Sequence, residues 1–219
     1  AMRPEGAIFD LDGTLTDSMY IWNEAPGALV RRFGKTPPEN LAGQLKEMGR
    51  LEASEYLIRT FGLCSTPEQV MESINELVSA EYRERVPLKP GVQALLSRLE
   101  ALGVPCGIAT ASEGFQARDA MRRLGQWEHF RFAISSLQYG PKTRPDIYFE
   151  AARRLGSHAQ RTLVFEDALH AARTAKEAGF LLAGVYDPSA EADQPTLRSL
   201  CDWYLPRLDD PGFLALLEA

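Results

Sequence analysis

Five short apolar runs, each followed by a segment with helical periodicity, constrain the fold of this 219-residue chain more than any other feature. The runs do not alternate polar with apolar residues, which is typical of parallel strands covered on both faces of a sheet. They cover residues 6–9, 104–109, 132–135, 162–165 and 181–185. The helical segments between them cover residues 90–102, 113–124, 145–155 and 168–178. This alternation predicts an α/β fold with a doubly wound, Rossmann-like parallel sheet.

The stretch from Asp17 to Val86 departs from this alternation, because it shows helical patterns and no convincing strand. The clearest patterns cover residues 20–33, 51–61 and 67–85. Thr66 followed by Pro67 has the composition of a helix start, with Thr66 as the N-cap. We therefore predict an all-helical domain, residues 17–86, inserted after the first strand of a core domain that comprises residues 1–16 and 87–219.

Charge and composition exclude several classes of function. The net charge is −6 with both signs interspersed, which argues against a broad nucleic-acid surface but leaves room for a local anion site. No apolar run is long enough to span a bilayer, and no signal peptide is evident. The three cysteines are far apart, which favours a reducing compartment. We expect a cytoplasmic protein that acts on a small molecule, as a monomer rather than an obligate oligomer.

Two acids follow the first predicted strand, separated by one residue. Asp10 and Asp12 stand at the end of an apolar run, where neighbouring carboxylates repel each other and lose solvation. Three features could compensate for that cost: a metal ion, a neighbouring lysine, or simple exposure to water.

Polar residues follow four of the predicted strands. In open α/β sheets ligands sit outside the carboxyl ends of the strands, so these residues are expected at one edge. The residues are Asp10, Asp12, Thr110, Ala111, Lys142, Glu166 and Asp167. Carboxylate oxygens suit Mg²⁺, whereas a lysine, a threonine hydroxyl and backbone N–H groups near a helix start suit an anion. We expect the anion that binds at this edge to be phosphate.

Each of these residues also has an ordinary structural interpretation. The Asp10–Asp12 pair could be a solvated turn, and Glu166 with Asp167 could be the acids that favour a helix N-terminus. Lys142 could be a surface lysine, and Thr110 could be an N-cap. The order and the positions of all these residues together favour a site.

Four segments of the sequence resemble the motifs of the haloacid dehalogenase-like hydrolases. The segments are FDLDGTLTDS from Phe9, TAS from Thr110, Lys142 with RPDIYFEAARRLG from Arg144, and VFEDA from Val164. The helical insert resembles the C1-type cap of the β-phosphoglucomutase and sugar-phosphatase branch. Together these segments extend over essentially the whole chain.

The resemblance implies the roles of the two acids that follow the first strand. Asp10 resembles the nucleophile that attacks phosphorus and becomes an aspartyl-phosphate. Asp12 resembles the general acid and base, and its backbone carbonyl is expected to bind the metal.

The resemblance also implies which residues bind phosphate and Mg²⁺. The Thr110 hydroxyl and the Ala111 N–H are expected to hold the phosphoryl oxygens, and Lys142 to counter the charge on the nucleophile and the phosphate. Asp167, together with Asp10, is the expected side-chain ligand of Mg²⁺. Glu166 beside Asp167 is expected to bind it directly or through water.

The sequence departs from the family pattern at three positions. Ala168 and Ala171 replace the usual Ser and Gly of the fourth motif, and Thr143 replaces the first Pro of the third. These changes are expected to alter local packing and rigidity without removing metal binding. His170 is expected to be a helix-surface residue.

Two residues of the insert bear on the reaction. Arg50 resembles a cap arginine that grips the non-reacting end of a sugar phosphate, although it could be a solvated arginine at a helix start. The mutases carry a histidine twelve residues after the nucleophile, where this chain has Trp22, which could also be core of the insert. An indole lacks imidazole chemistry, so we favour a Mg²⁺-dependent phosphatase of a small phosphorylated metabolite, a sugar phosphate. A phosphosugar mutase is the alternative, and an inactive domain used for binding is a remote one.

Overall fold

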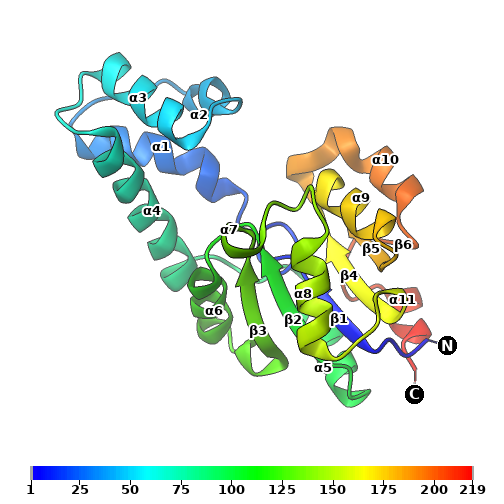
Figure 1. The fold of residues 1–219 in the computed structure, drawn as a ribbon. Helices are drawn as coiled ribbons and strands as arrows, with labels where there is room; N and C mark the ends of the chain where they lie inside the picture. Colours follow the sequence, from blue (N-terminus) through cyan, green and yellow to red (C-terminus); the bar gives the residue numbers. More distant parts are fainter. Residues whose placement is uncertain (1, 219) are drawn as a thin grey trace. The chain divides into compact units, whose positions relative to one another are not determined.

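The structure, a computed structural model, describes residues 2–218 and divides into two compact units (Figure 1). One unit runs up to Ser18 and resumes at Val86, and the other comprises Met19–Arg85. We call them the core unit and the helical insert. The divisions lie within two residues of the predicted boundaries.

The core unit contains a six-stranded sheet, counted over residues 2–218, with the order β3-β2-β1-β4-β5-β6 (Figure 1). All of its strand pairs are parallel, which confirms the predicted fold class. The strands are β1 (Gly6–Phe9), β2 (Cys106–Thr110), β3 (Phe130–Ser135), β4 (Thr162–Glu166), β5 (Leu181–Val185) and β6 (Trp203–Leu205).

Helices cover both faces of the sheet because neighbouring residues of each buried strand point to opposite sides. Ile8 belongs to a cluster that includes residues of α8, α9 and α10, and α8 and α9 lie in front of the sheet in Figure 1. Phe9, pointing the other way, stacks on Phe165, whose ring meets Phe213 of α11 edge-on. The helices of the core unit are α5 (Val92–Ala101), α6 (Gly114–Arg123), α7 (Ser136–Tyr139), α8 (Asp146–Leu155), α9 (Leu169–Glu177), α10 (Gln194–Leu200) and α11 (Pro211–Leu216).

The helical insert is built around its own buried cluster. Leu29, Leu57 and Val70 from three different helices pack together with Leu41. Thr66 caps the longest helix as predicted: its hydroxyl accepts from the Gln69 N–H at 3.2 Å, and the Gln69 side chain accepts from the Thr66 N–H at 3.0 Å. The helices are α1 (Tyr20–Arg32), α2 (Leu41–Leu45), α3 (Arg50–Phe61) and α4 (Pro67–Glu84). Among residues 2–218, none of the helices combines the length and the apolar character needed to cross a membrane.

Two chain segments join the core unit to the insert, and they pair with each other inside the core unit. Thr16 and Leu88 form an antiparallel bridge. The Asp17 N–H donates to the Pro87 carbonyl at 3.0 Å, and the Lys89 N–H donates to the Leu15 carbonyl at 2.9 Å. The segment that leads to the insert and the segment that returns from it therefore lie side by side.

Candidate active site

The winding of the sheet reverses at β1, whose two neighbours are β2 and β4. In sheets of this kind, ligands bind outside the carboxyl ends of the strands beside such a reversal. Asp10 directly follows β1, Glu166 ends β4, and Asp167 follows it. The Asp10 N–H donates to the Phe165 carbonyl at 3.0 Å, so the pairing of β1 with β4 holds the acids of both strands at one place.

Lys142, in the loop between α7 and α8, joins two of these carboxylates. Its Nζ lies 2.7 Å from Asp10 Oδ1 and 2.7 Å from Glu166 Oε1. The Thr14 hydroxyl lies 3.3 Å from Asp10 Oδ2 and 3.1 Å from Asp167 Oδ1. All five side chains are buried, so the structure brings together the acids and the lysine that the sequence places far apart.

Burial and mutual repulsion shift the protonation of this cluster. Burial, reinforced by the charge of Asp10, raises the pKa of Glu166 to about 8 despite the opposing effect of Lys142. The pKa of Asp167 is raised well above its usual range, first by burial and then by the charge of Asp10. Burial alone would lower the pKa of Lys142, but Asp10 and Glu166 outweigh it and raise the pKa, so Lys142 is an ammonium. Within the cluster, three carboxyl groups thus share a single ammonium.

The same cluster fits a divalent cation. Carboxylate oxygens of Asp10, Glu166 and Asp167 lie within 4.8 Å of one another. Glu166 Oε1 accepts from Lys142 and Tyr148, whereas the buried Oε2 has no hydrogen-bond partner, which is costly unless a ligand meets it. A Cβ at Gly13 would lie 2.2 Å from Asp167 Oδ2, so the glycine leaves room for that carboxylate. Hard oxygen donors with an excess of negative charge match the preference of Mg²⁺.

Two serine hydroxyls contact the side chain of Asp12. Its Oδ1 accepts from the Ser18 hydroxyl at 2.6 Å, and its Oδ2 accepts from the Ser112 hydroxyl at 2.8 Å. Ser112 lies two residues beyond the end of β2 and is itself held in place, because the Ser135 hydroxyl donates to its carbonyl at 2.7 Å. The Asp12 side chain therefore links the turn after β1, which carries it, to the residues that follow β2.

Thr110 and Ala111 lie where β2 ends, next to β1. Thr110 is fully buried, and its hydroxyl oxygen accepts from the Ser112 N–H at 3.0 Å. Ala111 is exposed, and α6 begins shortly afterwards, at Gly114. This edge of the sheet therefore offers a hydroxyl and backbone N–H groups beside the acids, an arrangement that suits an oxyanion.

Sequence reasoning missed three side chains that hold the site together. The Tyr148 hydroxyl donates to Glu166 Oε1 at 2.5 Å, Thr14 contacts two acids, and Ser18 binds Asp12. All three lie inside the quoted motifs, so the signal was present, but nothing in the pattern says which hydroxyl points inward. His170 is exposed on α9, as expected.

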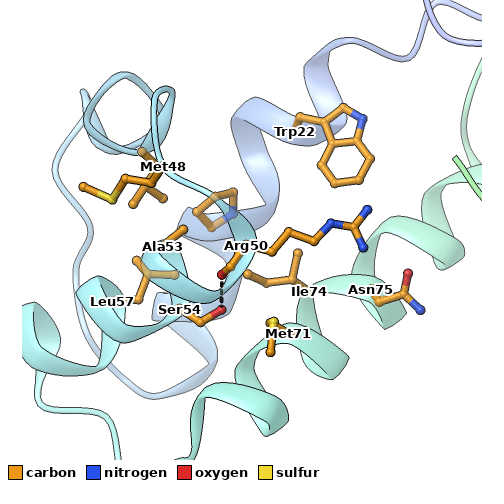
Figure 2. A pocket seen from close by; sticks show the side chains of 11 residues that line it. Trp22, Met48, Arg50, Ala53, Ser54, Leu57, Met71, Ile74 and Asn75 are labelled. Carbon is orange, nitrogen blue, oxygen red and sulfur yellow. Dashed lines mark hydrogen bonds between the residues drawn. The ribbon is translucent and has the colours of Figure 1, made fainter. Parts of the chain in front are cut away.

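The helical insert contains a second feature, a cavity of about 210 Å³ that both predicted insert residues line. Arg50 begins α3, and Figure 2 shows its side chain extending away from Met48 and Leu57, toward the side where Trp22 and Asn75 lie. The remaining lining is mostly apolar: Pro26, Leu45, Ala53, Met71 and Ile74, with Ser54. Trp22 is 40% exposed, which argues against the alternative that it fills the core of the insert.

A comparison with protein families identifies the group to which this site belongs. The model of the haloacid dehalogenase-like hydrolases matches residues 7–185. The chain belongs to this family. The match runs from β1 to the end of β5 and includes the acids, Lys142 and Thr110, and it confirms the resemblance drawn from the four motifs.

Relatives of this hydrolase include phosphatases. Hexitol phosphatase A of Escherichia coli is 30% identical over 203 residues, which cover 91% of this chain and 89% of that protein. The phosphorylated carbohydrates phosphatase of Thermotoga maritima is 26% identical over 176 residues, 80% of this chain and 82% of that protein. A crystal structure from Thermotoga maritima, proposed to be a β-phosphoglucomutase, shares the fold with a TM-score of 0.82 at 23% identity, covering 96% and 97% of the two chains. The chain is thus an enzyme of the hydrolase family.

Proposed function

We propose that the enzyme is a Mg²⁺-dependent phosphatase that hydrolyses a small phosphorylated metabolite, a sugar phosphate, through an aspartyl-phosphate. The observation that carries this proposal is the position of Asp10: at the reversal point of the sheet, 2.7 Å from a buried ammonium and within a cluster that fits a divalent cation. The phosphatases of phosphorylated carbohydrates and hexitols among its relatives support the substrate class.

Asp10 is the proposed nucleophile. One of its carboxylate oxygens attacks phosphorus, so that a bond from Asp10 to phosphorus forms as the ester P–O bond breaks. A carboxylate and a phosphate repel each other, and the Lys142 ammonium screens that repulsion from its place beside Asp10 Oδ1. The Thr14 hydroxyl near Asp10 Oδ2 fixes the orientation of the carboxylate.

Asp12 is the proposed general acid and base. It donates a proton to the ester oxygen as that oxygen leaves, and it then accepts a proton from the water that hydrolyses the aspartyl-phosphate. The hydroxyls of Ser18 and Ser112 hold both of its oxygens, so its orientation is set before the substrate arrives.

Thr110 and Ala111 are the proposed ligands of the phosphoryl oxygens that do not react. The Thr110 hydroxyl and the Ala111 N–H lie at the end of β2, beside Asp10 at the end of β1. Donors fixed on a strand end need not reorganise as charge spreads over these oxygens in the transition state.

Asp10, Glu166 and Asp167, with the backbone carbonyl of Asp12, are the proposed Mg²⁺ ligands. When bound, Mg²⁺ would neutralise the negative charge of the cluster and of the phosphate. Glu166 has one oxygen committed to Lys142 and Tyr148, which leaves Oε2 as its oxygen for the metal, directly or through water.

Arg50 and Trp22 are the proposed specificity residues, because both line the cavity of the insert. A phosphosugar mutase remains the alternative activity. Trp22 disfavours it, because an indole N–H only donates hydrogen bonds and cannot take part in proton transfer as an imidazole does. Phosphorus NMR of a hexose phosphate, with and without a bisphosphate activator, separates inorganic phosphate release from transfer between positions of the sugar.

The proposal is tested by substituting Asp10→Asn and measuring phosphate release from p-nitrophenyl phosphate and from a panel of sugar phosphates. The amide is nearly isosteric but is a very poor nucleophile, so turnover should fall by about 10³-fold or more. Asp119→Asn, on α6 of the same unit, is the matched control and should keep its activity. Turnover of the Asp10 variant within tenfold of the native enzyme would reject the nucleophile, and no turnover by the native enzyme would reject the activity.

A further inference from the structure

Lys89 is a nearly buried cation that belongs to none of the four motifs. Its side chain is 12% exposed, and its Nζ makes three short contacts. It donates to the Gly13 carbonyl at 2.9 Å, to the Tyr186 carbonyl at 2.8 Å and to Asp187 Oδ1 at 2.9 Å. An ammonium has three protons, so each of them has an acceptor.

One end of this arrangement is anchored on the sheet. Tyr186 and Asp187 directly follow β5, and Asp187 is 1% exposed. The other oxygen of Asp187 accepts from the Ser189 N–H at 3.0 Å, so the carboxylate is fixed from both sides. A buried carboxylate paired with a buried ammonium holds that ammonium firmly, because separating them leaves an uncompensated charge.

The other end is the turn that carries Asp12. The Leu11 carbonyl accepts from the N–H groups of Thr14, Leu15 and Thr16, and the Gly13 N–H donates to the Thr16 carbonyl. The turn is thus closed on itself, and the Gly13 carbonyl points out of it, to Lys89. The backbone of Lys89 also contacts the turn, because the Lys89 N–H donates to the Leu15 carbonyl.

The geometry points to Lys89 as a positioning residue for Asp12: its ammonium locks the turn after β1 to the end of β5 and to the segment on which the chain returns from the insert. This inference rests on the proposed function, in which Asp12 protonates the leaving oxygen. Gly13 directly follows Asp12 in the chain, so a shift of the Gly13 carbonyl moves the backbone that carries the acid. Small displacements of a catalytic acid reduce its contribution strongly.

The test is Lys89→Met, which keeps an unbranched side chain that is one atom shorter and removes the ammonium. Lys89→Arg is a second variant, which keeps the charge but not the three contacts from one atom. Each variant is assayed on an alkyl phosphate and on p-nitrophenyl phosphate. An alkoxide needs a proton to leave, whereas nitrophenolate leaves without one, so formation of the aspartyl-phosphate depends on the placement of the acid only for the alkyl phosphate. kcat/KM reports the steps up to that formation, and the later hydrolysis, in which Asp12 is the base, is common to both substrates. The ratio of the two kcat/KM values does not depend on how much of the protein is folded.

We expect Lys89→Met to lower kcat/KM for the alkyl phosphate by about tenfold to hundredfold and for p-nitrophenyl phosphate by less than about threefold. Lys89→Arg should fall between this variant and the native enzyme. Asp12→Asn should show the same selective loss in larger measure, and Lys176→Met, which breaks an outer pair with Asp202 at 2.6 Å, should show none. An unchanged ratio in both Lys89 variants would overturn the inference. A native enzyme without turnover, or an Asp12 variant without the selective loss, would instead count against the proposed function.

Discussion

At the scale of single residues, Asp10 and Asp12 show how one side-chain type can be given two environments. Asp10 is buried beside the Lys142 ammonium, whereas Asp12 is partly exposed and accepts from two serine hydroxyls. The repulsion expected between them is relieved in two of the ways that the sequence left open, a lysine for one acid and partial exposure for the other. Asp10 thus has a charged neighbour and Asp12 has hydroxyl donors, so the two acids have different surroundings for the two roles that the proposed mechanism gives them.

The raised pKa of Glu166 predicts how the stability of the metal-free enzyme depends on pH. Its pKa rises from 4.5 to about 8 on folding, so the folded state holds this proton more tightly than the unfolded state. The corresponding stability is fully present below about pH 4.5 and is lost as the pH rises to about 8. We expect the Tm of the chelated enzyme to fall by on the order of 10 °C or more across this window.

The control for this prediction is Glu166→Gln, which lacks the titrating group and should lose less stability over the same window. Mg²⁺ binds the ionised form, so adding it should raise the Tm of the native enzyme more at pH 8 than at pH 5. Scanning calorimetry of both proteins, with chelator and with Mg²⁺, measures these shifts. Parallel pH slopes in the two proteins would contradict the assignment to Glu166.

At the scale of elements, the sequence predicts those whose burial produces a clear pattern. The runs at β1 and β5 predict these strands to the residue, because strands covered on both faces are continuously apolar. β6 spans three residues at the edge of the sheet, and α2 spans five, so neither is long enough to produce a periodic signal. β2 begins at Cys106, two residues later than predicted.

Within the site, the acids could be predicted because strand ends meet at one edge whatever the packing around them. Lys142 could be predicted because it lies in the connection that follows β3. Tyr148 and Lys89 could not, for a physical reason. Each acts through one polar atom at the end of a long side chain, and packing between distant elements sets the direction of that atom. Tyr148 and Glu166 are 18 residues apart in the sequence, and Lys89 and Asp187 are 98 residues apart.

The N-terminus of α3 carries a prediction about substrate selection. If Arg50 holds the part of the substrate that does not react, Arg50→Ala should lower kcat/KM for the best sugar phosphate by about tenfold to hundredfold, since a charged hydrogen bond contributes about 1.5–3 kcal/mol. p-Nitrophenyl phosphate has no such group and should lose less than about threefold. Arg59→Ala, in the last turn of the same helix, is the control. Equal losses on both substrates would remove Arg50 from specificity.

At the scale of the whole molecule, the enzyme should require Mg²⁺ for turnover but not for folding. Exhaustive chelation should abolish phosphate release and leave the circular dichroism spectrum unchanged, because each unit has its own apolar core. Mg²⁺ should restore activity and Ca²⁺ should inhibit, since Ca²⁺ takes more and longer oxygen contacts than the octahedral geometry of Mg²⁺ and could engage both oxygens of Asp10. Full activity in the presence of chelator would remove the metal from the mechanism.

The pairing of the two connecting segments has an evolutionary consequence. Because Asp17 and Pro87 are joined by a hydrogen bond of 3.0 Å, the two ends of the insert are attached to the core unit at neighbouring positions. A short loop from Asp17 to Pro87 could replace the insert without disturbing a strand. A different insert of any length could be attached at the same two positions. A lineage built on this plan can therefore exchange the insert, the proposed source of specificity, while it inherits the residues of the core unit unchanged.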